Sequence, residues 1–164
     1  MTLLLIGMMG SGKSTVGEIL AAQLGIPFID LDSIIEKMTG KSVYTLFDQF
    51  GESHFRKLES EILKENINKN AVISCGGGII LGKENRVLLK SGTVIYLDAS
   101  ISELKKRLKN ANERPLLKNG TLEESLRQIL IKREKLYTKC ANIIINVNGE
   151  IPDDISHKII SLLN

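Results

Sequence analysis

The chain has no tryptophan, only two cysteines and three prolines, and aromatic residues make up only 4% of its 164 residues. So few rings argue against a protein that stacks nucleic-acid bases on an aromatic platform. Cys75 and Cys140 lack the spacing of metal ligands, so we interpret them as reduced, partly buried thiols. Neither a base-stacking surface nor a cysteine-bound metal is indicated.

The chain also lacks long apolar runs and a strong charge of one sign. No stretch approaches the roughly eighteen apolar residues of a membrane span, and no basic region precedes the first apolar run. We therefore expect a cytoplasmic protein that binds no membrane. The net charge of +3 comes from 22 basic and 19 acidic residues, well mixed along the chain. This mild excess suits small anionic ligands, and it provides no basic stripe for nucleic acid.

The length and the apolar pattern predict one α/β domain over residues 1–164. Short apolar runs, each predicting a buried strand, occur at residues 3–6, 27–30, 71–74, 93–98 and 142–146. Helical patterns separate them, and the last predicted helix begins near Pro152. Capping-box signatures at Ser100 with Glu103 and at Thr121 with Glu124 predict two helix starts. Such alternation predicts a parallel sheet covered by helices on both faces.

A glycine-rich segment follows the first apolar run. Gly7, Gly12, Lys13 and Ser14 fit the pattern G-x-x-x-x-G-K-[ST] between a predicted strand and a predicted helix. In such a loop the backbone N–H groups and the helix N-terminus attract phosphates, the lysine reaches the outer phosphates, and the hydroxyl can hold Mg²⁺. The alternative is a glycine-rich turn that contains a lysine by chance. The flanking strand and helix favour a nucleoside triphosphate site.

Further candidate residues follow the second and third predicted strands, since ligands of open parallel sheets bind beyond the carboxyl ends of the strands. Asp30 and Asp32 are two residues apart, so on an extended segment both would face one site. One could serve a metal while the other binds or deprotonates an acceptor hydroxyl. Alternatively, one of them caps the next helix. Three glycines at 76–78 predict a close approach of the backbone to a ligand, or else a flexible connection.

The arginines are ambiguous by themselves. Arg56 and Glu59 are three residues apart on a predicted helix, a spacing that favours a solvated ion pair. Arg114 and Arg133 have no clear role, because most arginines lie at the surface. Residues 109–120 are polar and contain a proline and an Asn-Gly pair, which predicts a mobile loop between two helices.

Taken together, the motifs resemble those of the shikimate kinase family over essentially the whole chain. They are the phosphate loop, DLD (30–32), FRKLE (55–59), SCGGG (74–78), RPLL (114–117) and KREKLY (132–137), in the family's order and spacing. The resemblance implies a nucleoside monophosphate kinase-like fold with sheet order 2-3-1-4-5 and a mobile lid at about residues 109–120. It implies transfer of the ATP γ-phosphoryl group to the 3-hydroxyl of shikimate, with Mg²⁺ as cofactor, on the route to chorismate and the aromatic amino acids. We expect a monomer.

The resemblance also implies roles for individual residues. The positions that match shikimate-binding positions are Asp32, Arg56, Gly77, Gly78 and Arg133. Those that match the ATP site are Gly10, Ser11, Gly12, Lys13, Ser14, Thr15, Arg107 and Arg114, with Arg107 near the adenine. Lys13, Asp32 and Arg114 match catalytic positions, and Ser14 and Asp30 match the Mg²⁺ environment. Residues 146–152 depart from the family's pattern, which leaves the adenine contacts open.

Two other functions stay open at this point. A related P-loop kinase acting on gluconate or on a nucleoside monophosphate would share the fold and the phosphate loop. A module that binds a nucleotide without catalysis would also share them. The combination of DLD, FRKLE and GGG in this order favours shikimate kinase.

Overall fold

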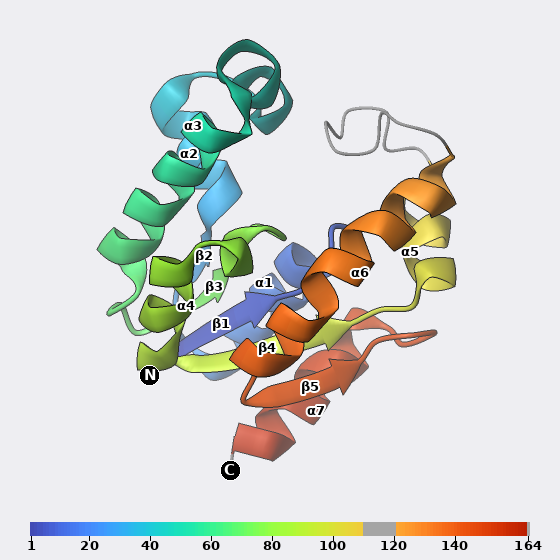
Figure 1. Cartoon of the computed structure of the whole chain (residues 1–164). Helices are drawn as coiled ribbons and strands as arrows, with labels where there is room; N and C mark the ends of the chain where they lie inside the picture. The colour runs from blue at the N-terminus through green and yellow to red at the C-terminus, as the bar shows by residue number, and fades with distance from the viewer. Residues whose placement is uncertain (110–120, 164) are drawn as a thin grey trace.

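The computed structural model describes residues 1–109 and 121–163, which contain one sheet of five parallel strands (Figure 1). The strands are β1 (Thr2–Ile6), β2 (Phe28–Asp30), β3 (Ala71–Ser74), β4 (Thr93–Asp98) and β5 (Ile143–Asn146). Their order in the sheet is β2-β3-β1-β4-β5. The predicted parallel α/β fold and its strand order are confirmed, with no strand boundary displaced by more than about one residue.

Helices cover both faces of the sheet, as predicted. The helices are α1 (Lys13–Leu24), α2 (Leu31–Thr39), α3 (Val43–Asn66), α4 (Lys83–Leu88), α5 (Ile101–Arg107), α6 (Leu122–Cys140) and α7 (Pro152–Leu163). Two short 3₁₀ turns, η1 (Ile79–Leu81) and η2 (Leu89–Ser91), flank α4. In Figure 1, α1 and α7 lie behind the sheet, and α4 and α6 lie in front of it.

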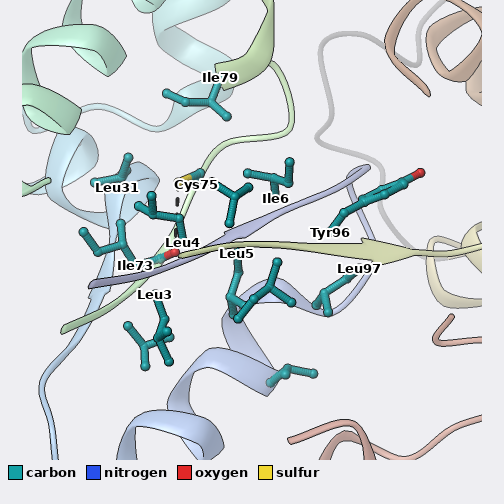
Figure 2. Close-up of a cluster of buried hydrophobic side chains, with 14 of the residues drawn as sticks. Leu3, Leu4, Leu5, Ile6, Leu31, Ile73, Cys75, Ile79, Tyr96 and Leu97 are labelled. Carbon is teal, nitrogen blue, oxygen red and sulfur yellow. Dashed lines mark hydrogen bonds between the residues drawn. The ribbon is translucent and has the colours of Figure 1, made fainter. Parts of the chain in front are cut away.

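The core is built around β1, the central strand. Its neighbours β3 and β4 run parallel to it on either side. Leu3 and Leu5 point toward α1, whereas Leu4 and Ile6 point to the opposite face (Figure 2), and all four are fully buried. A central strand buried on both faces needs apolar residues at successive positions, which explains the continuous apolar run of the sequence.

Local signals place the helices that carry the site. Asp30 caps α2, since its side chain accepts a hydrogen bond from the backbone of Ser33. Gly51 interrupts α3 with φ 81° and ψ 165°, so a separate helical stretch begins just before Arg56. At the start of α6, Thr121 and Glu124 form the predicted capping box.

The predicted helix start at Ser100 is also confirmed, although the capping box is incomplete. The Ser100 hydroxyl accepts from the backbone of Glu103, while the Glu103 carboxylate pairs with Arg107. Apart from its first residue, Lys109, the predicted lid at 109–120, with its Arg114, lies outside the described residues. Within 1–109 and 121–163, no helix combines the length and apolar character needed to cross a membrane.

Candidate active site

A cavity of about 520 Å³ opens at the carboxyl ends of the strands, where the sheet rule predicts it. The predicted site residues that line it are Gly10, Gly12, Lys13, Ser14, Thr15, Asp30, Asp32, Gly77 and Arg107. Arg56, Gly78 and Arg133 are not part of this lining. They adjoin it through the glycine segment 76–78. The structure therefore brings together all the predicted site residues that it describes, apart from the side chain of Ser11.

The phosphate loop connects β1 to α1. Gly12 precedes α1 with φ 97°, a backbone conformation that residues other than glycine rarely adopt. Lys13 is the first residue of α1 and is only 9% exposed. Its Nζ donates to the carbonyls of Gly7 at 3.0 Å and Met8 at 2.9 Å. The lysine therefore lies folded along its own loop, at the floor of the cavity.

Ser14 and Asp30 form an oxygen-rich pair beside Lys13. The Ser14 hydroxyl donates to Asp30 Oδ2 at 2.6 Å, while Asp30 Oδ1 accepts from Ser33 N at 3.1 Å. The same carboxylate thus caps α2 and contacts the phosphate loop. Among the described residues there is no group of three or more His, Cys, Asp or Glu side chains that could hold a metal. A hydroxyl and one carboxylate nevertheless fit Mg²⁺, which usually takes one or two protein ligands together with phosphates and waters.

The sequence predicted that Asp30 and Asp32 lie together on an extended segment. This prediction is wrong. Asp30 caps a helix that starts at Leu31, so Asp32 belongs to its first turn. Both carboxylates still line the cavity. Burial raises the pKa of Asp32, and the neighbouring charge of Asp30 raises it further, while Lys13 partly opposes the shift. Within the described part of the chain, Asp32 Oδ1 has no hydrogen-bond partner, so it is available to a ligand.

The three glycines at 76–78 each pack against a different site group. A Cβ on Gly76 would lie 2.2 Å from Glu59 Oε1, and one on Gly78 would lie 2.2 Å from the Arg56 guanidinium. A Cβ on Gly77 would meet the Gly7 carbonyl at 3.3 Å and Arg133 Nη1 at 3.5 Å. A side chain at Gly76 or Gly78 would therefore displace Glu59 or Arg56, and one at Gly77 would press against the Gly7 carbonyl. The predicted close approach of this backbone to a ligand stays a prediction, because the contacts described here are all within the protein.

The ion pair of Arg56 and Glu59 is not the solvated pair that its spacing favoured. Arg56 Nη1 lies 2.7 Å from Glu59 Oε2, and Glu59 is 0% exposed. Burial raises the pKa of Glu59, whereas the charge of Arg56 opposes that shift. Sequence reasoning missed Glu59 as a site residue. The only available signal was its position three residues after a candidate arginine.

Arg133 is also buried, at 5% exposure, although arginines usually lie at the surface. It extends from α6 toward Gly77. One helical turn later, the Tyr137 hydroxyl donates a hydrogen bond to the Gly77 carbonyl. Tyr137 had no assigned role in the sequence analysis. Its position four residues after Arg133 puts both side chains on one face of α6.

Arg107 connects three segments at the other end of the cavity. Its Nη1 donates to the Ser11 carbonyl, and its Nη2 donates to the Val147 carbonyl, both at 3.0 Å. Its Nε donates to Glu103 at 2.7 Å. The Ser11 side chain is fully buried, and it is the backbone carbonyl of this residue that accepts the hydrogen bond from Arg107. Segment 146–152, which departs from the family pattern, therefore contacts the phosphate loop through Arg107.

This sheet order, with a phosphate loop after the central strand, is the fold of the P-loop, nucleoside monophosphate kinase-like class. The family model for shikimate kinase matches residues 9–164. A shikimate kinase of Thermodesulfovibrio yellowstonii is 42% identical over 160 residues, covering 96% of this chain and 92% of the relative. The chain therefore belongs to the shikimate kinase family, whose members are ATP-dependent transferases.

Solved structures agree with this assignment. Shikimate kinase from Acinetobacter baumannii in complex with shikimate superimposes with a TM-score of 0.96 at 37% identity, covering 99% of this chain and 92% of that chain. A gluconokinase from Sinorhizobium meliloti gives a TM-score of 0.65 at 20% identity, covering 98% and 89% of the two chains. At that identity the second likeness shows the fold alone.

Proposed function

We propose that this chain transfers the γ-phosphoryl group of ATP to the 3-hydroxyl of shikimate, giving shikimate 3-phosphate and ADP. The observation that carries the proposal is a pair of arginines, one from α3 and one from α6, that pack against the glycine segment beside the phosphate-loop cavity. Arg56 packs on Gly78, and Arg133 packs on Gly77. Planar guanidinium groups bind a carboxylate through paired hydrogen bonds, and shikimate carries one carboxylate on a small ring.

Asp32 is proposed to bind and orient the hydroxyl that attacks. Its unpartnered Oδ1 can accept a hydrogen bond from a ring hydroxyl and then take its proton. The raised pKa of Asp32 makes it a better proton acceptor than a solvated aspartate. Because Asp32 and Lys13 line one cavity, the acceptor hydroxyl and the outer phosphates can lie next to each other there.

The phosphate loop is proposed to bind ATP through the backbone of Gly10, Ser11 and Gly12 and through Lys13 and Thr15. Lys13 would exchange its present carbonyl partners for phosphate oxygens, and Arg107 would lie near the adenine. Ser14 and Asp30 are the residues that would hold Mg²⁺. When bound there, this ion would neutralise charge on the phosphate oxygens.

We further propose that the chain acts as a single-domain monomer in the cytoplasm. One continuous sheet that includes both the first and the last strand supports the single domain. In the same proposal, residues 109–120 are a lid that brings Arg114 to the transferring phosphoryl group. Closing a lid would exclude water, which otherwise competes for that group.

The test is an assay of ADP release from ATP and Mg²⁺ with one acceptor at a time. Shikimate should stimulate ADP release strongly, whereas gluconate and AMP should leave it near the rate without acceptor. Formation of shikimate 3-phosphate, detected by mass spectrometry, should match ADP release mole for mole. Equal stimulation by AMP and shikimate would overturn the assignment of the acceptor, even though the fold and the phosphate loop remain as described.

A further inference from the structure

Tyr137 is a buried polar residue that the proposed reaction does not use directly. It lies on α6, is 0% exposed, and packs its ring on Tyr96, with ring centroids 5.0 Å apart and planes 20° from parallel. Its hydroxyl donates to the Gly77 carbonyl, and the charge of the nearby Arg133 guanidinium partly opposes the burial that raises the pKa of this hydroxyl. One hydroxyl is therefore bonded to Gly77 and lies near Arg133, and both of these residues are proposed to hold the carboxylate of shikimate.

We propose that the Tyr137 hydroxyl is a positioning group for recognition of the substrate carboxylate, acting through Arg133 and Gly77. This inference rests on the proposed function. The hydroxyl fixes the guanidinium of Arg133 relative to the glycine segment, so the two keep the spacing that a planar carboxylate requires. The Tyr137–Gly77 hydrogen bond joins α6 to the segment that follows β3, 60 residues earlier in the chain.

Gly77 also packs against the phosphate loop. The space beside its Cα is bounded by the Gly7 carbonyl, by Met9 N and by Arg133 Nη1. The loop therefore limits how far the Gly77 peptide can shift, so loss of the Tyr137 hydroxyl should act on Arg133 rather than on the phosphates. Burial raises the pKa of Tyr137 to about 12, so the hydroxyl keeps its proton and remains a donor throughout the neutral range.

The experiment compares Tyr137→Phe with Tyr96→Phe. Each variant loses one hydroxyl from the same stacked pair of rings. The Tyr96 hydroxyl, however, donates at 3.1 Å to Oδ1 of Asp98, which lies outside the proposed site. Tyr137→Phe should weaken shikimate binding about fivefold or more, which is the expected effect of leaving buried hydrogen-bonding groups unpaired. Tyr96→Phe should change it less than about twofold. Both variants should bind ATP with near wild-type affinity.

Two further measurements separate positioning from general loosening of the fold. The first is the dissociation constant for an analogue whose carboxylate is a neutral amide, divided by the dissociation constant for shikimate. This ratio does not depend on the fraction of folded protein, so it remains informative if Tyr137→Phe is less stable. It should fall in Tyr137→Phe and not in Tyr96→Phe. The second is the same substitution in an Arg133→Ala background, where its effect on shikimate binding should shrink.

Equal effects of the two tyrosine substitutions, or an effect undiminished in the Arg133→Ala background, would overturn the inference. These outcomes differ from a failure of the proposed function. If wild-type protein shows no ADP release with shikimate, the proposed function fails, and this inference fails with it. If wild-type protein is active and the tyrosine variants behave alike, only the role of Tyr137 is disproved.

Discussion

Arg56 lies between two carboxylates of very different burial: its Nη1 is 2.7 Å from Glu59 Oε2, and its Nη2 is 3.2 Å from Glu52 Oε1. The Glu59 side chain is 0% exposed, whereas that of Glu52 is 45% exposed. Hydrogen bonds to charged groups contribute most where water does not compete for them. Glu59 should therefore orient Arg56, and Glu52 should contribute little.

The first prediction compares Glu59→Gln with Glu52→Gln. Glu59→Gln should raise KM for shikimate about tenfold or more, because the guanidinium loses its buried charged partner. Glu52→Gln removes an exposed pair and should change the free energy of binding by less than about 1 kcal/mol. Steady-state kinetics with shikimate as the varied substrate measures both. Similar KM values in the two variants would show that Glu59 does not orient Arg56.

The second prediction concerns Lys13. Lys13→Met should retain the fold and reduce kcat by about a hundredfold or more, since the lysine is proposed to offset charge on the outer phosphates. Lys37→Met, at an exposed position on α2, is the control and should leave kcat unchanged. Circular dichroism and a thermal melt establish folding before rates are compared. A near-normal kcat in Lys13→Met would remove the phosphate loop from the mechanism.

The third prediction uses the raised pKa of Asp32. The folded protein holds this proton to a higher pH than the unfolded chain, whose carboxyl titrates near the ordinary value of 3.8. The stability that the protonated form contributes is therefore present in acid and is lost as the pH rises through the raised pKa. Asp32 therefore contributes less to the stability of the fold at about pH 7 than in acid.

Asp32→Asn should accordingly have a higher Tm than wild type at about pH 7, by a margin that narrows toward about pH 4. The same variant should lose about a hundredfold or more in kcat, because an amide cannot take a proton from the acceptor hydroxyl. Glu65→Gln, at an exposed position of α3, is the matched control and should change neither quantity much. A Tm for Asp32→Asn below that of wild type at both pH values would contradict the burial argument.

The fourth prediction tests Arg133 as a carboxylate-binding residue. Losing one partner of a desolvated charged contact typically costs about 2–5 kcal/mol, so Arg133→Ala should weaken shikimate binding roughly thirty-fold to several thousand-fold. Arg133→Lys should restore only part of the loss, because an ammonium lacks the planar fork. ATP affinity should change little, and calorimetric titration of each ligand measures the effects.

The control for Arg133 comes from the same helix. Arg127 has a side chain that is 61% exposed, and it pairs with Glu123. Arg127→Ala should alter shikimate binding by less than about 1 kcal/mol. Wild type should discriminate strongly against the amide analogue of shikimate, and Arg133→Ala much less. Equal discrimination by these two proteins would show that Arg133 does not bind the carboxylate.

Much of this fold could be predicted from local patterns. The apolar runs gave five strands because a parallel sheet buried on both faces needs continuous apolar segments. The phosphate loop could be predicted because its residues lie within one short segment, 7–14. The strand order 2-3-1-4-5, by contrast, came only from the family resemblance, since no local pattern specifies which strands become neighbours.

The parts that could not be predicted depend on tertiary burial. The Arg56–Glu59 spacing is the same whether the helix face is solvated or covered, so the sequence did not reveal that Gly76 and Gly78 pack against this pair. The helical position of Asp32 was missed because Asp30 ends the strand and caps the helix at once. Tyr137 was missed because its partner, Gly77, is 60 residues away in the chain.

The central position of β1 has a consequence for synthesis of the protein. Leu3 pairs with Val72 on one side and with Thr93 on the other, so the first strand made has neighbours that are translated much later. At roughly 5–20 residues per second, this apolar segment waits several seconds on the ribosome without a sheet partner. The phosphate loop is anchored to the end of β1, so nascent chains that stop before β4 should lack an ordered nucleotide site. Nucleotide binding by this protein should therefore begin only after β4 has been made.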